Sequence, residues 1–154
     1  MRRALLVLPA ALLLASCAAP VAPTSLDTAI AAPYRGDKAQ ARDVYRHPKD
    51  TLEFFGLAPN QSVLEIAPGG GWYTDILAPY LRGRGTLYEA QYLPPQGTLP
   101  AGEAKSNAAF EHKLAAEPEI YGTVVVGTLQ SGQFKGLPAG LQVDRVLTFR
   151  NIHN

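Results

Sequence analysis

The sequence predicts an α/β fold in which helices cover both faces of an open parallel β-sheet. Two observations predict it. Short apolar segments alternate with segments of helical periodicity along most of the chain. The first apolar segment, 62–66, is joined to the next helix by the glycine-rich stretch 67–71. Because parallel strands need long crossover connections, this alternation favours right-handed strand–helix–strand units.

Local signals place the elements in chain order. Helix-forming residues begin at Asp37 and stop before Pro48, because a proline disfavours the helical conformation in the residue before it. Gly56 ends a second short helix, and Gly83 ends the helix that follows the glycine stretch. Helices are expected at 37–46, 48–55, 72–83 and 103–117, with loops at 92–102 and 130–141. About four strands, in the spatial order 3-2-1-4, are expected at 62–66, 85–90, 121–129 and 143–149.

The N-terminus carries the features of an export signal. A cationic start, Met1–Arg3, precedes an uncharged apolar run at 4–15, which is shorter than the roughly 20 residues that a membrane-spanning helix needs. The residues that follow, 14–17 (LASC), resemble the lipobox of bacterial lipoproteins. The resemblance implies cleavage before Cys17, acylation of its thiol and anchoring to a membrane. The absence of an aspartate at Ala18 implies the periplasmic face of the outer membrane.

The chain is therefore expected to have three parts. Residues 1–16 are the lipoprotein signal peptide, residues 17–36 are an Ala/Pro-rich tether, and residues 37–154 are a single domain. Without the signal peptide, 12 basic side chains stand against 13 acidic ones, and no basic patch is visible, which argues against a nucleic-acid partner. Cys17 is the only cysteine, so no internal disulfide can form, and three scattered histidines give no metal-binding pattern.

The glycine-rich stretch 67–71 has the setting of an anion-binding loop. Between a strand and a helix, glycines let the backbone approach a ligand, and N–H groups at the start of the helix can bind an anion. The pyrophosphate of a dinucleotide and the carboxylate of a methionine moiety would both fit. Glu65 favours the second, because its carboxylate would repel a pyrophosphate and attract the ammonium and sulfonium groups of S-adenosylmethionine. Thr74 also stands where the dinucleotide pattern has a third glycine.

The segment 63–74 (VLEIAPGGGWYT) resembles motif I of Rossmann-like methyltransferases, and more narrowly a group of exported methyltransferase-like lipoproteins with the sequence EIxPGGGWYT. The resemblance covers about 37–154 and implies a Rossmann-like fold with S-adenosylmethionine as cofactor. It implies that the methionine part of the cofactor is surrounded by Glu65, Gly69 and Gly71, with Ala67 and Gly70 in the same loop. Ala67 departs from the motif, which has glycine there, and narrows the room for the cofactor.

Two more cofactor contacts are expected after the second and third strands. Glu89 ends the second expected strand, about 20 residues after Gly69, where a carboxylate would bind the two ribose hydroxyls. The resemblance implies that Gln130 or Ser131 contacts the adenine. The alternatives are a solvated Glu89 carboxylate and a glycine stretch that is only a tight turn.

Asn151 and His153 are the candidate catalytic residues. Both follow the fourth expected strand at the carboxyl edge of the sheet, where ligands bind in open α/β folds. There they could face an acceptor group, and His153 could serve as a general base near neutral pH. The alternative is a polar terminus without partners.

Methyltransferases of this family need three further strands, whereas the sequence stops at Asn154. The fourth strand is therefore expected at an open edge of the sheet. Three explanations are left open: the chain is a fragment, its gene is truncated, or a partner chain completes the sheet. Three functions remain open: transfer of a methyl group to an unknown acceptor, a non-catalytic envelope protein tethered to the membrane, and a nicotinamide-dependent oxidoreductase.

Overall fold

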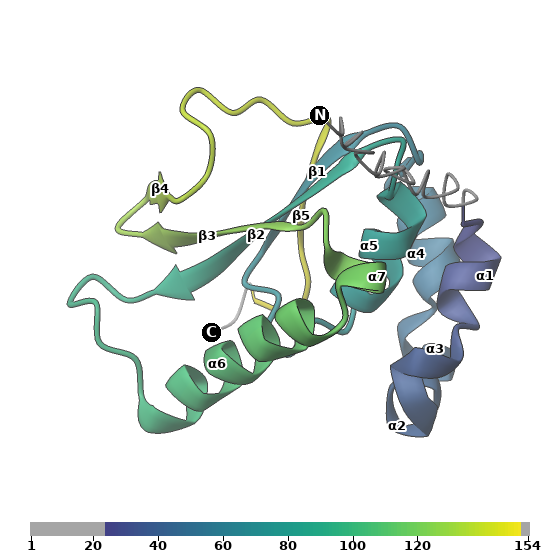
Figure 1. The fold of residues 1–154 in the computed structure, drawn as a ribbon, viewed down its shortest axis with the longest axis horizontal. Coiled ribbons are helices and arrows are strands. Elements are labelled where there is room, and N and C mark those ends of the chain that lie inside the picture. Colours follow the sequence, from purple (N-terminus) through teal and green to yellow (C-terminus); the bar gives the residue numbers. More distant parts are fainter. Residues whose placement is uncertain (1–23, 152–154) are drawn as a thin grey trace, which may run out of the picture.

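A computed structural model of the chain describes residues 24–151, in which helices pack against a β-sheet (Figure 1). The helices are α1 (Leu26–Ile30), the 3-10 turn η1 (Pro33–Arg35), α2 (Gly36–Gln40), α3 (Asp43–Arg46), α4 (Pro48–Phe54), α5 (Thr74–Leu81), α6 (Ala101–Ala116) and α7 (Pro118–Tyr121). The strands are β1 (Ser62–Ile66), β2 (Thr86–Leu93), β3 (Val125–Gln130), β4 (Gln133–Lys135) and β5 (Arg145–Thr148).

The strands form one sheet in the order β4-β3-β2-β1-β5. Strands β1, β2, β3 and β5 run parallel, and β4 pairs antiparallel with β3. The predicted α/β class and the predicted order of four parallel strands are confirmed, with β5 as the fourth of them. Among the described strands β5 pairs with β1 alone, so it forms one edge of the sheet.

Strand β4 lies in the segment 130–141, which was expected to be a loop, so that expectation is wrong for Gln133–Lys135. All three residues of β4 are exposed, and a strand of three residues with a single apolar side chain is too short to give a periodic signal in the sequence. The hairpin is made by Ser131 and Gly132, whose φ angles of 50° and 75° are those of a two-residue turn with both central residues in the left-handed region.

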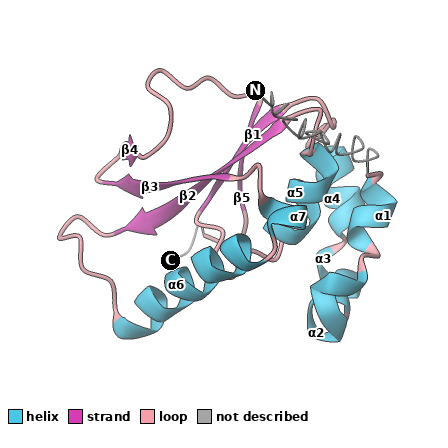
Figure 2. Cartoon of the chain, viewed as in Figure 1, coloured by secondary structure: helices cyan, strands magenta, loops and turns pink. Residues whose placement is uncertain are grey.

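The hydrophobic core lies on one face of the sheet. Val63 pairs in register with Leu87, and Leu147 pairs with Glu65, so the three apolar side chains share a face. On this face they meet buried side chains of α1, α4, α5 and α7, which include Ala29, Leu52, Ile76, Leu77 and Tyr121. The helices accordingly lie to the right of the strands and below them in Figure 2. On the opposite face, Val146 of β5 is 57 % exposed.

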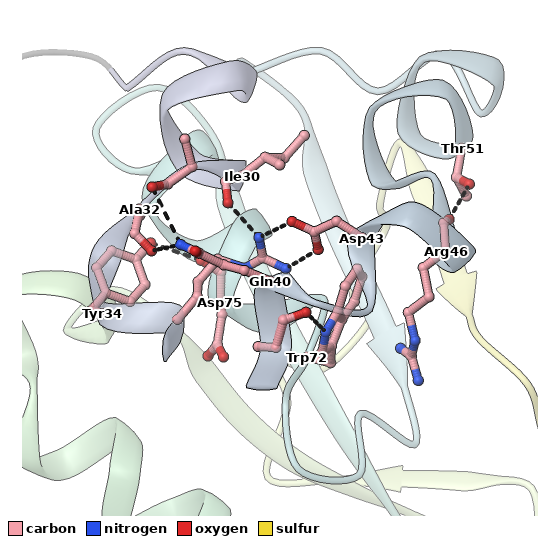
Figure 3. A network of polar contacts seen from close by, with 12 residues as sticks. Ile30, Ala32, Tyr34, Gln40, Asp43, Arg46, Thr51, Trp72 and Asp75 are labelled. Carbon is pink, nitrogen blue, oxygen red and sulfur yellow. Dashed lines mark hydrogen bonds and ion pairs between the residues drawn. The ribbon is translucent and has the colours of Figure 1, made fainter. Parts of the chain in front are cut away.

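Residues 24–36 were expected to belong to an unfolded tether, and for these residues the expectation is wrong. Ser25 caps α1 by accepting a hydrogen bond from the Thr28 N–H (3.1 Å), and Ala29 is fully buried against α5. The Arg35 guanidinium is buried as well, where it donates to both carboxylate oxygens of Asp43 (2.7 and 2.9 Å) and to the Ile30 carbonyl (Figure 3). Small alanine side chains let α1 approach α5 closely. An Ala-rich composition, which is typical of a tether, is therefore also compatible with a packed helix. Residues 17–23 lie outside the described part.

Among the element boundaries that differ from those expected, three change the arrangement of the chain. The helix at 37–46 is divided into α2 and α3 by a turn at Ala41 and Arg42. The strand expected from residue 121 begins only at Val125, because α7 starts with Pro118 at its first position and buries Tyr121 in the core. Strand β2 continues past residue 90 to Leu93.

None of the helices within residues 24–151 is both long enough and apolar enough to cross a bilayer. The expected signal peptide at 1–16, the lipidated Cys17 and the candidate base His153 lie outside the described residues.

Candidate functional site

The loop between β1 and α5 turns on three residues with positive φ. These are Ala67 at 54°, Gly69 at 59° and Gly71 at 77°. A Cβ atom on Gly71 would lie 2.6 Å from the Phe110 ring of α6, so this position requires glycine for space as well as for conformation. Ala67 occupies the same left-handed region with a methyl group, which explains why a glycine at this place in the motif would be easier to accommodate.

Lys113 of α6 holds the loop against the rest of the domain. Its ammonium group donates to the Gly70 carbonyl (3.0 Å) and to Asp75 Oδ1 (2.6 Å) at the start of α5. The Tyr121 hydroxyl donates to the same carboxylate oxygen (2.7 Å). The loop, α5, α6 and α7 are therefore joined by one partly buried polar cluster.

Two carboxyl groups lie side by side beneath the loop. Glu65 of β1 and Glu89 of β2 are register partners on neighbouring parallel strands, and their exposed fractions are 2 % and 0 %. Glu65 Oε2 accepts a hydrogen bond from the Thr74 hydroxyl at the start of α5 (3.0 Å). Neither oxygen of Glu89 has a hydrogen-bond partner within residues 24–151. A buried pair of this kind destabilises the fold unless a proton or a cation compensates it.

Burial controls the protonation of this pair. It raises the pKa of Glu65 to about 7, although the neighbouring Glu89 carboxyl and then the Thr74 hydroxyl act in the opposite direction. Burial, and then the neighbouring charge of Glu65, raises the pKa of Glu89 well above its ordinary value. The pair therefore keeps a proton at higher pH than two exposed carboxyl groups would.

A cavity of about 820 Å³ opens at the carboxyl edge of the sheet. One wall is the loop, through Ala67, Pro68 and Gly69. The remaining lining comes from the ends of β1 and β2, from α6 and from the segment after β5: Ile66, Gln91, Tyr92, Glu103, Ser106, Asn107 and Asn151. The chain passes to one side of β1 through β2 and β3 and to the other side at β5, so the cavity lies at the switch point of the sheet, where open α/β folds bind ligands.

The structure brings part of the predicted site to this cavity. Ala67 and Gly69 line it, and Gly70 lines a second, smaller cavity on the other side of the loop. Gly71 faces the Phe110 ring instead. Glu65 and Glu89 lie beneath the loop and line neither of these two cavities.

Gln130, expected at the adenine, is engaged elsewhere. Its amide nitrogen lies 3.3 Å from each of the Pro94 and Pro95 carbonyl oxygens, and its amide oxygen accepts from Lys135 (2.9 Å). It therefore ties the loop after β2 to the hairpin and lines neither of the two cavities.

Asn151 lines both cavities, as its predicted place at the carboxyl edge requires. Its amide donates to the Thr148 hydroxyl (2.8 Å) and lies 3.4 and 3.3 Å from the Ile66 and Ala67 carbonyls. These contacts brace the end of β1, which is a positioning role for the loop.

The sequence reasoning missed Gln91, Tyr92 and Glu103. Gln91 follows Glu89 by two residues and so shares its face of the sheet, but it lies further toward the carboxyl edge. The signal was present in the run of strand-forming residues YEAQYL, which continues β2 past residue 90. Within residues 24–151, no group of three or more His, Cys, Asp or Glu side chains is arranged to hold a metal ion.

Comparisons with known proteins found similarity in the fold alone. No protein-family model and no curated protein matches the chain. Among solved structures, a protein-L-isoaspartate O-methyltransferase is similar over 66 % of this chain and 28 % of its own, with 16 % identity and a TM-score of 0.45. A cyclopropane-fatty-acyl-phospholipid synthase-like protein from Lactobacillus casei ATCC 334 is similar over 80 % of this chain and 45 % of its own, with 19 % identity and a TM-score of 0.46. The chain thus spans less than half the length of both proteins.

Proposed function

We propose that the chain carries the cofactor-binding part of an S-adenosylmethionine-dependent methyltransferase. The observation that carries the proposal is the 820 Å³ cavity at the switch point of the sheet, walled by a loop with three positive φ angles. Its volume lies within the usual range for small-molecule sites. S-adenosylmethionine supplies an electrophilic methyl group on a sulfonium centre.

The lining residues suit the parts of this cofactor. Gln91 and Glu103 offer an amide and a carboxylate to the ribose hydroxyls. Tyr92, which is 49 % exposed at the end of β2, offers a ring face for adenine. Gly71 donates its backbone N–H to the Pro68 carbonyl (3.0 Å), so the N–H groups of Gly69 and Gly70 are the ones in this loop that would bind the methionine carboxylate.

The buried carboxyl pair favours a cationic ligand over a dinucleotide. Glu65 and Glu89 are buried in the strands next to the loop and line neither cavity, so they act on a bound ligand through their charge alone, and a positive charge at the loop would stabilise the ionised form of Glu65. A pyrophosphate in the same place would be repelled. Thr74 stands where a third glycine would be needed for a dinucleotide, and its hydroxyl is already bound to Glu65.

Titration calorimetry with S-adenosylhomocysteine tests the proposal. We expect saturable binding at one site per chain, no heat with reduced nicotinamide cofactor, and binding weakened about tenfold or more by Gln91→Ala, because a buried hydrogen-bonding group is lost. The matched control is Gln133→Ala, on the exposed β4. Absence of heat with S-adenosylhomocysteine would leave the non-catalytic envelope protein as the better explanation, and heat with the nicotinamide cofactor would favour an oxidoreductase.

We also propose that the chain is anchored to a membrane through a lipid on Cys17, as the apolar run at 4–15 and the following LASC sequence suggest. Labelled palmitate supplied to cells that express the chain should become attached to it. The substitution Cys17→Ser should abolish the label. Label retained in that variant would refute the anchor.

A further inference from the structure

A second cavity, of about 500 Å³, lies on the other side of the loop, next to α2 and α3. Its lining contains four basic side chains, Lys38, Arg42, Arg46 and Arg150, and a single acidic one, Asp75. A concave site lined mainly by positively charged side chains favours the binding of an anion.

Two acidic groups near these basic residues are already paired. Asp75 binds Lys113 at 2.6 Å, and Asp43 of α3 binds the buried Arg35 at 2.7 Å. The four basic side chains of the cavity appear in no ion pair among the described residues.

Arg46 is the half-buried member of this basic group. Its guanidinium carbon lies 4.5 Å from the centre of the Trp72 ring and 5.9 Å from that of Tyr73, and Figure 3 shows its side chain extending beside Trp72. Its Nε–H is buried and has no acceptor within residues 24–151. Burial, and then the charge of Arg42, lowers the pKa of Arg46, and Arg150 acts in the same direction. A buried donor without an acceptor is costly, and a bound oxyanion would remove that cost.

Three aromatic side chains, Trp72, Tyr73 and Phe149, also line this cavity. The Tyr73 ring stacks on Phe149, with centroids 3.5 Å apart and planes 15° apart, and Trp72 meets Tyr73 edge-on. The Trp72 indole N–H donates to the Ala39 carbonyl of α2 (3.0 Å), which holds its ring in place. Such walls fit an aromatic or otherwise flat ligand body.

The two cavities share one wall, made of Ala67, Pro68, Gly69 and Asn151. A ligand in the smaller cavity would therefore lie across the loop from a cofactor in the larger one. Methyl transfer would require the acceptor atom to reach past this wall to within about 3–3.5 Å of the methyl group.

We propose that the smaller cavity is the acceptor site and that it selects an acceptor with a carboxylate or phosphate group on a flat apolar body. The acceptor role rests on the proposed methyltransferase function. Arg46 and Arg42 would bind the oxyanion, and Trp72, Tyr73 and Phe149 would contact the apolar part.

Trp72 is the only tryptophan of the chain, so its fluorescence reports on this cavity. Phenyl phosphate and benzoate are the probes, and benzyl alcohol is the neutral control. We expect a saturable fluorescence change with both anions and none with the alcohol. Arg46→Gln and, separately, Arg42→Gln should weaken phenyl phosphate binding about tenfold, as expected for a charge-assisted hydrogen bond. Arg84→Gln, at the other end of α5, should change nothing.

Each variant is also titrated with S-adenosylhomocysteine in a calorimeter, and its melting temperature is compared with that of the wild type. Arg42 is exposed, so its variant remains informative even if Arg46→Gln fails to fold. Affinity for S-adenosylhomocysteine that stays within about twofold in a folded variant supports the acceptor site.

A fluorescence response that is absent, or equal for benzyl alcohol, overturns the proposal even if the cofactor binds. An equal loss of affinity for phenyl phosphate and S-adenosylhomocysteine also overturns it, because the arginines would then hold the cofactor's own carboxylate. Anion binding without S-adenosylhomocysteine binding would support the anion site and refute the methyltransferase function.

Discussion

Ala67, the first residue after β1, has a left-handed backbone conformation with φ of 54°. A Cβ atom in this region costs roughly 1–2 kcal/mol, and part of that cost is offset in glycine by its greater freedom in the unfolded chain. Ala67→Gly should therefore raise the free energy of unfolding by about 0.5–1 kcal/mol in urea denaturation. Ala104→Gly, on the exposed face of α6, is the control in a regular helix, where the same substitution should lower the free energy of unfolding by about 1 kcal/mol. A loss of stability in Ala67→Gly would contradict the strain assigned to this residue.

Gly70 and Gly71 form a matched pair in the same loop. A Cβ atom on Gly71 would lie 2.6 Å from the Phe110 ring, which is only 2 % exposed and cannot move aside, whereas Gly70 has open space around it. Gly71→Ala should cost about 2 kcal/mol or more, through overpacking and the positive φ, while Gly70→Ala should cost much less. Thermal unfolding of the two variants measures the difference. Equal costs would mean that the loop does not pack on α6 as described.

At the scale of the elements, the Lys113 side chain makes the polar contacts that join α6 to the loop. Lys113→Met keeps the length of the apolar stem but removes the contacts to Gly70 and Asp75, so a partly buried carboxylate loses its cation. We expect a loss of about 1–3 kcal/mol in the free energy of unfolding. The loop amides should also exchange hydrogen faster. Lys105→Met on the exposed part of α6 serves as control; a comparable loss there would argue against the role of Lys113.

The element boundaries decide how much of the site the sequence could reveal. The order of the parallel strands followed from right-handed crossovers, and the glycine loop was identified from residues 67–71 alone. The burial of each side chain could not be predicted from the sequence, because it depends on where a strand ends. Since β2 continues to Leu93, Glu89 falls inside the sheet, and the cavity is lined by Gln91.

The helix α1 was missed for a different reason. Leu26, Ala29 and Ile30 are too few to predict a helix of five residues, and an isolated helix of that length is unstable. Its stability comes from packing against α5, which is a tertiary effect. The hairpin strand β4 is similarly supported by backbone pairing with β3 rather than by its own exposed side chains.

The buried carboxyl pair affects the stability of the whole molecule. Burial raises the pKa of Glu65 from 4.5 to about 7, so between these values the folded state keeps a proton that the unfolded chain has released. The free energy of unfolding contributed by this group therefore falls as pH rises through that window. The loss should be about 2 kcal/mol between about pH 5.5 and about 8.

Glu89 adds to the same trend, because burial and the charge of Glu65 raise its pKa well above its ordinary value. Glu89→Gln should flatten the pH dependence above about pH 7, since the second ionisation of the pair is removed. Urea denaturation at a series of pH values measures the slope. Glu111→Gln, on the exposed face of α6, should leave it unchanged. A wild-type stability that rises with pH over this range would show that the pair is not buried together.

The location of the cofactor is tested most directly by a crystal structure of the protein grown with S-adenosylhomocysteine. We expect the nucleoside in the 820 Å³ cavity, within hydrogen-bonding distance of Gln91 and Glu103, and the homocysteine part over residues 69–71. Ligand density on another face of the sheet, or a dinucleotide-like path across Thr74, would contradict a methyltransferase site at this loop.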